Sequence, residues 1–537
     1  MGPPLSRACW HVHPGDRVAL SFAAGCDKSC AMIWMRVAVL ALVLAVEAGC
    51  TSGGGGSSSP PSVPWEKFRQ DLGNTGEGIA GVIKNPGGTP TPVAILWQKN
   101  IDNSKISASP AISIESQLFI GTEHGTLAAL NLSDGSSAWP SNVVSCSACN
   151  CPTSPGLGTL KASPAVYTNN NQTNVLVASE EGSVYGFQFS GNNAPSCVFC
   201  LQPACKQSPP PACGEPPASV SFVSSPSFTI NPSTSNISGI FIGATVTDGS
   251  GGISGRLYAL NADGTCKWQF PNPFTGATPT PTPAPGTPSP TAVSSSGFGP
   301  ITSSPAISLG NTVYFTTDDG FLYALTPNGD FLWRVELAGG SALPLAPSPV
   351  ANTTSIITSS ANGVILALNA NGSFYWGLDA RSDDPDFANS LAVGVPANTP
   401  TPTGTAAPTA VTPTLTPVPG VSLLAVVAIH SGGTVSLIDA ATGIPLRPDP
   451  LAKIAGPVVS SPALSSDGYI IIGDHDGVLH AISTVDGSEP HAWNWPIILR
   501  PTPQATPQPI RSSPALDGGG VAYVGSDDGY LYAVGTK

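Results

Sequence analysis

The stretch SSPAISLGNTVYFTTDDGFLYALTPNGDFLW, residues 303–333, decides the fold because degraded copies of it recur along almost the whole chain. The most constant part is a turn glycine followed in order by a variable residue, an apolar residue, a second variable residue, a small residue and a second apolar residue. It occurs eight times, at Gly125, Gly182, Gly255, Gly320, Gly363, Gly433, Gly477 and Gly529. Seven copies follow a Ser-Pro phrase, at Pro110, Pro164, Pro226, Pro305, Pro349, Pro462 and Pro514, and the sixth copy lacks it. A repeat of about 40 residues indicates an architecture built from similar units.

Each copy predicts four short antiparallel strands. The first begins at the Ser-Pro phrase, where proline is tolerated because no ladder donor is needed. The second, Val313–Thr317, alternates β-branched and aromatic residues, and Asp319-Gly320 forms the tight turn that glycine permits. The third is Phe321–Leu325, and the fourth ends at Trp333. Four strands in each of many units predict a β-propeller.

The two ends of the chain predict that this propeller is closed. The eighth copy stops at Lys537 after three strands, and Ile95–Gln98 reads as the missing fourth strand, with Trp97 in the expected place. An N-terminal strand that pairs into the last blade leaves no exposed sheet edge, whereas an open solenoid needs capping repeats. We therefore predict an all-β closed propeller of eight four-stranded blades. Seven blades is the alternative because the sixth copy is weak.

A tryptophan phrase carries a family resemblance. Ala129-Leu130-Asn131, Asp134-Gly135 and Trp139 together resemble the tryptophan-docking repeat of pyrroloquinoline-quinone-like (PQQ-like) propellers. Shorter versions end at Trp268, Trp333 and Trp376, so with Trp97 these are the expected repeat tryptophans. The opening Trp65–Asp71 with Asn74-Thr75-Gly76 resembles the segment that precedes the first blade in such proteins. Within this family the chain resembles the propeller lipoprotein of the outer-membrane β-barrel assembly machinery and, more distantly, the quinoprotein dehydrogenases.

The N-terminal region predicts export. Arg36 precedes the apolar run Val37–Val46, and Ala48-Gly49-Cys50 is followed by glycines and serines, which resembles a bacterial lipoprotein signal, cleavage site and tether. We predict lipid attachment at Cys50. The alternative is an ordinary cleaved signal, because Glu47 stands where lipoprotein signals usually carry leucine. The expected domains are an upstream extension plus signal (1–50), a Gly/Ser/Pro tether (51–64) and the propeller (65–537).

Two kinds of insert interrupt the propeller. Thr/Pro-rich segments at 276–298, 398–420 and 500–510 predict extended, solvated polyproline-like loops, either spacers or glycan carriers or neutral expansions. Cysteine-rich segments lie at 140–160 and 190–216. An even number of cysteines in an exported chain predicts disulfides. The alternative is a zinc site, which we disfavour because no histidine is near. The cysteines are Cys146, Cys149, Cys151, Cys197, Cys200, Cys205, Cys213 and Cys266.

Composition excludes one class of partner. The chain is 41% hydrophobic and 10% charged, with 59 Gly and 57 Pro, which is typical of a turn-rich all-β protein. Its net charge of -13 and its lack of basic clusters exclude a nucleic-acid partner.

No catalytic constellation stands out. A quinone enzyme needs a carboxylate base and Ca²⁺ ligands beside its cofactor. The candidate acids each stand in the turn before the glycine of their own copy, where aspartate is first a turn former. The candidate histidines show no ligand spacing. We therefore predict no catalytic residue, no metal site and no cofactor. The acids are Asp318, Asp319, Asp474, Asp476, Asp527 and Asp528, and the histidines are His430, His475, His480 and His491.

Two functional hypotheses remain. The favoured one is an exported, lipid-anchored, non-catalytic binding or assembly scaffold of the cell envelope, periplasmic or at the cell surface. We expect a monomer whose partner is an unidentified envelope protein or surface component. The alternative is a periplasmic quinoprotein oxidoreductase that depends on PQQ and Ca²⁺.

Overall fold

The structure is a computed structural model, and all elements named below lie within the unit Pro60–Lys537. It describes residues 71, 74, 92–148, 156–169, 172–189, 194–204, 217–231, 237–271, 298–337, 348–351, 355–360, 363–379, 390–394, 424–446 and 450–536. These residues form strands β1 to β32 and one 3₁₀ turn, η1 (His491–Trp493). Among them, no helix is long and apolar enough to cross a membrane.

The strands form eight antiparallel sheets, which we number as blades 1 to 8 in chain order. Blade 1 contains β2 (Ala111–Ile112), β3 (Gln117–Gly121) and β4 (Leu127–Asn131), and blade 2 contains β5 (Ala165–Asn169), β6 (Gln172–Ala178), β7 (Val184–Phe189) and β8 (Ser196–Leu201). Blade 3 contains β9 (Ser219–Ser221), β10 (Ser227–Ile230), β11 (Ile237–Thr247), β12 (Ile253–Leu260) and β13 (Cys266–Phe270), and blade 4 contains β14 (Ala306–Ile307), β15 (Val313–Thr317), β16 (Phe321–Leu325) and β17 (Phe331–Glu336).

The second half of the chain repeats this plan. Blade 5 contains β18 (Val350–Ala351), β19 (Ile356–Ser359), β20 (Val364–Leu368) and β21 (Phe374–Asp379), and blade 6 contains β22 (Ala392–Gly394), β23 (Ala425–Ile429), β24 (Thr434–Asp439) and β25 (Ala452–Lys453). Blade 7 contains β26 (Ala463–Leu464), β27 (Tyr469–Gly473), β28 (Val478–Ser483) and β29 (Ile497–Ile498). Blade 8 contains β30 (Ala515–Leu516), β31 (Ala522–Gly525), β32 (Tyr530–Thr536) and, from the other end of the chain, β1 (Val93–Asn100).

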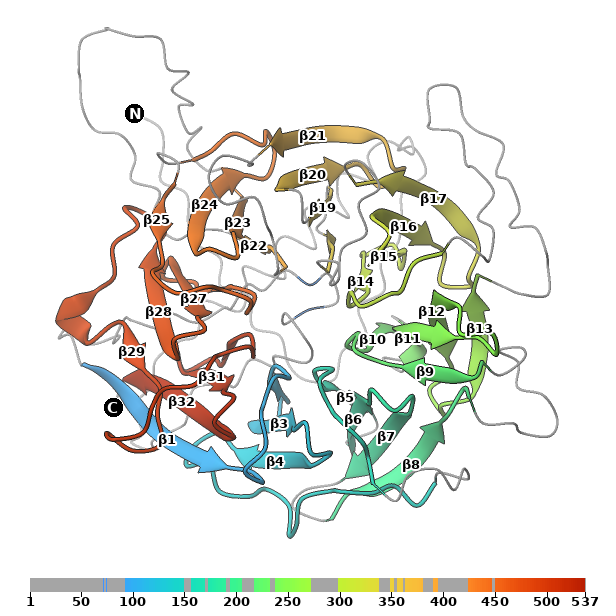
Figure 1. The fold of residues 1–537 in the computed structure, drawn as a ribbon, viewed down its shortest axis with the longest axis horizontal. Helices are drawn as coiled ribbons and strands as arrows, with labels where there is room; N and C mark the ends of the chain where they lie inside the picture. The colour runs from blue at the N-terminus through green and yellow to red at the C-terminus, as the bar shows by residue number, and fades with distance from the viewer. Residues whose placement is uncertain are drawn as a thin grey trace, which may run out of the picture. The chain divides into compact units, whose positions relative to one another are not determined.

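The ring closes through the N-terminal strand. β1 pairs antiparallel with β32, from Val93 opposite Thr536 to Asn100 opposite Tyr530, and Figure 1 shows the two side by side. The sixth blade is complete, so the ring has eight blades and the seven-bladed alternative is excluded. The closed all-β propeller predicted from the repeat is confirmed. Blade 1 has three strands, and its outer edge is reduced to two isolated bridges, Leu127 with Val143 and Leu130 with Ser137.

Outer tryptophans join neighbouring blades. The indole Nε1–H groups of Trp97, Trp268, Trp333 and Trp376 donate to the carbonyls of Leu132, Pro327, Ala370 and Ala440 of the following blade, at 2.8 to 3.3 Å. Each ring covers a turn glycine of that blade. At Gly135, where φ is 68°, an added Cβ would lie 2.6 Å from Cε3 of Trp97. Only glycine fits this position, because it has no Cβ and tolerates positive φ.

The indole hydrogen bond is also missing, among the described residues, at the joints on either side of blade 2. Trp139 in blade 1 is 2% exposed and packs against Phe119 and Phe189, but among the described residues its Nε1 has no hydrogen-bond partner. In blade 2 the position belongs to Phe199, which has no N–H to donate, and a Cβ at Gly264 would overlap its ring. The contacts of blade 1 with blade 2 and of blade 2 with blade 3 therefore depend on packing, and a disulfide described below also joins blade 1 to blade 2.

One predicted insert is described in full. Residues 500–510 form the connection from blade 7 to blade 8 and contain no strand. They contain a turn in which the Ala505 N–H donates to the Thr502 carbonyl at 3.0 Å. This segment is therefore not uniformly extended. Most of the inserts at 276–298 and 398–420 lies outside the described residues.

Candidate functional site

Eight serines form a closed hydrogen-bonded ring at the start of the innermost strands. The backbone N–H of each serine donates to the hydroxyl oxygen of the next, at 2.8 to 3.1 Å. The N–H of Ser513 donates to the hydroxyl oxygen of Ser109, which closes the ring. All eight are buried. The ring consists of Ser109, Ser163, Ser225, Ser304, Ser348, Ser390, Ser461 and Ser513. In the sixth blade Leu391 replaces the proline, but Ser390 is kept, so the serine is the structurally decisive half of the repeated phrase.

Asn74 reaches this serine ring from the segment that precedes β1. Its side chain is fully buried, and Nδ2 donates to the carbonyls of Ser304 at 3.1 Å and Pro349 at 3.2 Å, in blades 4 and 5. Its own N–H donates to the Asp71 carbonyl at 3.1 Å. Asn74 therefore occupies space at the level of the ring. Trp65, Thr75 and the remaining residues of this N-terminal motif, apart from Asp71, lie outside the described residues.

A belt of charged side chains lies beside the serine ring. In five blades the turn between the second and third strands contacts the connection that enters the blade. In each contact a backbone N–H of the turn donates a hydrogen bond to a backbone carbonyl of the connection. The donors are Glu123, Glu180, Asp318, His475 and Asp527. Ser107, Lys161, Thr302 and Arg511 stand on these connections, two residues before a ring serine. We call the turn residues together with Lys105, Lys161 and Arg511 the mouth belt.

The carboxylates of the mouth belt are paired with residues of the connections. Ser107 Oγ donates to Glu123 at 2.9 Å, Lys161 Nζ lies 3.0 Å from Glu180, and Thr302 Oγ1 donates to Asp318 at 2.7 Å. Arg511 Nε donates to Oδ2 of Asp527 at 3.0 Å, and Lys105 Nζ lies 3.6 Å from the same oxygen. The acid in each pair stands in a turn, and its partner lies 16 to 19 residues earlier in the chain. The exception is Lys105, which lies 422 residues before Asp527 in the sequence.

This geometry corrects part of the sequence interpretation. Asp474 accepts N–H groups of Asp476 and Val478, and Asp528 accepts that of Tyr530, as expected for turn formers. Asp318 and Asp527 instead bind the entering connection through Thr302 and Arg511. Asp319 likewise accepts the Gly299 N–H at 3.0 Å. The sequence missed this because each partner belongs to a different segment of the chain.

His480 stands between two carboxylates in blade 7. Its Nε2 lies 3.1 Å from Asp474 Oδ2, and its Nδ1 lies 2.7 Å from Glu489 Oε1. Burial alone would lower the pKa of His480, but the hydrogen bonds and negative charges of Asp474 and Glu489 outweigh it and raise the pKa to about 9. The imidazolium therefore persists at neutral pH as part of a buried ionic cluster.

The other candidate histidines lie apart. His430 is buried, and His491 Nδ1 lies 2.9 Å from the Trp495 carbonyl oxygen. Burial and the nearby Arg511 lower the pKa of His475. Within the described part of the chain, no group of three or more His, Cys, Asp or Glu side chains has the arrangement of a metal site.

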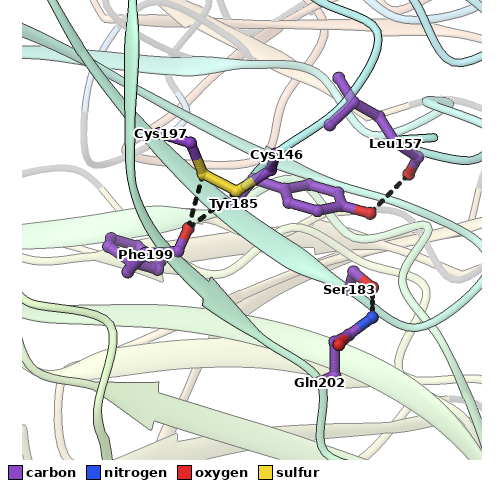
Figure 2. Close-up of a disulfide and its surroundings, with 7 residues drawn as sticks. All are labelled: Cys146, Leu157, Ser183, Tyr185, Cys197, Phe199 and Gln202. Carbon is purple, nitrogen blue, oxygen red and sulfur yellow. Dashed lines mark hydrogen bonds between the residues drawn. A yellow bond between two sulfur atoms is a disulfide. The ribbon is translucent and has the colours of Figure 1, made fainter. Parts of the chain in front are cut away.

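Cysteines lie at the joints around blade 2, where the tryptophan hydrogen bond is missing. Cys146, after blade 1, forms a disulfide with Cys197 in β8 of blade 2, with Cα atoms 5.4 Å apart (Figure 2). Both sulfur atoms lie within 3.8 Å of the Phe199 carbonyl oxygen. Cys200 and Cys266 are also in disulfides. Four predicted disulfide cysteines, Cys149, Cys151, Cys205 and Cys213, and the predicted lipid site Cys50 lie outside the described residues.

The serine ring does not fit a quinone cofactor at its own level. The Asn74 carboxamide fills part of that space and holds inner carbonyls of two blades, so a planar ligand there would have to displace it. We therefore derive no reaction step through a quinone.

Comparisons with known proteins agree with this fold. The family model described as outer membrane protein assembly factor BamB matches residues 253–537, more than half of the chain. A europium-containing methanol dehydrogenase is similar in structure at 12% identity (88% of this chain, 98% of that chain, TM-score 0.56). So is the quinohemoprotein alcohol dehydrogenase from Comamonas testosteroni, at 12% identity (88% and 81%, TM-score 0.53). BamB from Moraxella catarrhalis matches at 13% identity (83% and 98%, TM-score 0.45). Among curated protein sequences, none matches. The similarity to the two dehydrogenases shows the fold alone.

Proposed function

We propose that this chain, which belongs to the PQQ-repeat propeller family described as outer membrane protein assembly factor BamB, is a non-catalytic binding or assembly scaffold of the cell envelope. The observation that carries the proposal is the closed ring, in which eight serines and the β1–β32 pairing hold the blades in one frame. Such a frame presents its loops in fixed positions, which lowers the conformational cost of binding.

The chemistry of the mouth belt favours binding over catalysis. A general base needs a carboxylate that can take up a proton from substrate. Here Glu123 and Asp318 accept hydroxyl hydrogen bonds, and Glu180 and Asp527 are paired with cations. These contacts hold the carboxylates in fixed orientations, as recognition groups require.

The N-terminal region supports a place at the membrane. With Cys50 acylated, residues 51–64 would connect the anchor to the propeller. A flexible Gly/Ser-rich tether of this length has an end-to-end distance of about 20 Å. The propeller would then work close to the envelope surface, where an assembly partner is within reach.

Affinity capture tests the proposal. Tagged full-length chain, expressed in its cell envelope and cross-linked before solubilisation, should retain a specific envelope protein or surface component in stoichiometric amount. The matched control is a chain with charge reversals in the mouth belt (Lys161→Glu and Arg511→Glu). A separate reconstitution with PQQ and Ca²⁺ should give no bound quinone absorbance and no dye reduction. A stoichiometric, active quinone complex would reject the scaffold proposal.

A further inference from the structure

We propose that β21, the outer strand of blade 5, is a strand-addition site, at which a partner protein adds an extended, cationic segment to the blade. The inference rests on the proposed function, because it treats the molecule as a scaffold. It names the edge that receives a partner and the chemistry of the partner segment.

The edge of β21 is unprotected, unlike the edges of the other outer strands. β21 is the last strand of its sheet, so its outer edge pairs with no described strand, and Figure 1 shows it on the rim of the ring. Proteins protect such edges with basic side chains, prolines, short strands or covering segments. β1, β13 and β17 carry Lys99, Lys267 and Arg334. β8 is joined by a disulfide to Cys146, and β25 and β29 have 2 residues each. β21, with the sequence FYWGLD, has none of these features.

Two exposed aromatic side chains stand beside this edge. Phe374 is 66% exposed and Tyr375 is 42% exposed. Tyr375 stands at a shift in register, and Trp376–Asp379 pair regularly with β20. In an antiparallel ladder alternate residues direct their N–H and C=O groups away from the neighbouring strand, so this part of β21 offers backbone groups to an added strand. The Phe374 ring lies over Gly377, where an added Cβ would be 3.2 Å from Cζ or Cε2 of the ring at the closest. The apolar surface therefore extends along the strand to its backbone edge.

The exposure of Phe374 follows from the residue that the preceding blade supplies. Phe331 is the corresponding residue of blade 4. It stacks on Phe270 of blade 3, with ring centroids 6.2 Å apart, and is 6% exposed. In blade 4 the position that corresponds to Phe270 belongs to Val335, whose side chain is too small to cover a phenyl ring. Phe374 is therefore left open to a side chain of an added strand.

The charge of the chain selects the kind of partner. A second copy is disfavoured, because two chains of net charge -13 repel each other. The contact would also be small, since β21 has 6 residues, about 20 Å of strand, whereas a stable interface buries about 1,200 Å² or more. The same charge attracts a cationic segment, and Glu336, exposed at the end of the neighbouring outer strand β17, adds to this attraction. The occupant is therefore an extended segment of another protein, in which basic residues alternate with apolar residues that cover Phe374.

Peptide binding tests the inference. The probe is a short, fluorescently labelled peptide in which lysine alternates with valine, titrated onto the purified full-length chain at physiological ionic strength. We expect saturable binding, and slower hydrogen exchange in β21 but not in β17 when the peptide is bound. Phe374→Ser and Tyr375→Ser should each weaken binding about tenfold, because each removes an aromatic contact with the added strand. The matched control is Leu332→Ser, at the exposed position of β17 that corresponds to Tyr375, and it should leave binding unchanged.

A second control separates strand addition from simple charge attraction. The same peptide with every backbone amide N-methylated keeps its lysines but has no N–H donors, so it should not bind. Equal binding of the N-methylated peptide, equal weakening by Leu332→Ser, unchanged exchange of β21 or no saturable binding of the probe would overturn the inference. Self-association that Tyr375→Ser abolishes would overturn it in favour of a second copy. Failure of the probe to bind with envelope capture intact rejects only this inference, and probe binding without envelope capture rejects only the scaffold proposal.

Discussion

Replacing Trp97 with alanine should weaken the joint between the last blade and the first. The Trp97 side chain is partly buried, its Nε1–H donates to Leu132 at 2.8 Å, and its ring centroid lies 5.7 Å from that of Tyr523. Removing a fully buried tryptophan costs about 3–5 kcal/mol, and one hydrogen bond contributes about 1 kcal/mol. Because Trp97 is only partly buried, we expect the free energy of unfolding to fall by about 2–3 kcal/mol.

A double-mutant cycle with Gly135→Ala isolates the docking contact. Alanine at φ 68° costs about 1 kcal/mol for the backbone, and the clash of its Cβ with Trp97 adds about 1–3 kcal/mol. In the Trp97→Ala background the clash disappears, so the coupling energy should be about 1–3 kcal/mol. The matched control is Gly251→Ala, which has φ 87° and open space around the added Cβ. It should cost the same in both backgrounds.

Urea denaturation followed by far-ultraviolet circular dichroism, with disulfides intact, measures all these variants. If the Trp97 and Gly135 changes are additive within about 0.5 kcal/mol, Trp97 does not dock on Gly135 in solution. The argument for ring closure through this contact would then be wrong.

Three further predictions concern the anchor, the disulfide and pH. Cys50→Ala should move the chain from the membrane to the soluble fraction, whereas Cys9→Ala should not. Replacing both Cys146 and Cys197 with serine opens a loop with a sequence separation of 51 and should cost about 2–4 kcal/mol in denaturant unfolding. The folded-state pKa of His480, about 9, lies above its unfolded value of 6.5. Its stabilising effect should therefore be complete below pH 6.5 and disappear as pH rises through 9. His480→Gln should remove this part of the pH dependence.

Each of these predictions has a clear contrary result. Unchanged fractionation of Cys50→Ala would argue against an acyl anchor. A cysteine double variant that unfolds at the wild-type urea concentration would show that packing alone holds blades 1 and 2 together. Identical urea midpoints of wild type and His480→Gln from pH 6 to pH 10 would show that the ionic cluster does not stabilise the fold.

The repeat was enough to predict the fold because it encodes local structure. Strand alternation, turn glycines and the Ser-Pro phrase specify one blade each, and the ends of the chain specify closure. The sequence showed a strand around Trp97 that belongs to no repeat of its own. In the structure this strand is β1, and it pairs with β32 as predicted. Ser390 was overlooked because the sequence argument weighed the proline, while the ring uses the serine.

The candidate site was only partly predictable because it forms between segments. Asp527 binds Arg511, 16 residues earlier on another segment, and Asn74 binds carbonyls more than 200 residues away. Glu489 contacts His480 and lies 9 residues after it in the sequence, a spacing that matches no ligand motif. Phe199 takes the tryptophan position of blade 2, which a search for indoles cannot find.

Hydrogen exchange of β1 tests the central claim most directly, because the serine ring and the mouth belt both depend on closure. Amides from 93 to 100 pair with β32 over its whole length. Closure predicts that the hydrogen-bonded amides of β1 exchange as slowly as those of β32, and that Trp97→Ala accelerates both strands together. Fast exchange of β1 beside a protected β32 would contradict the closed ring.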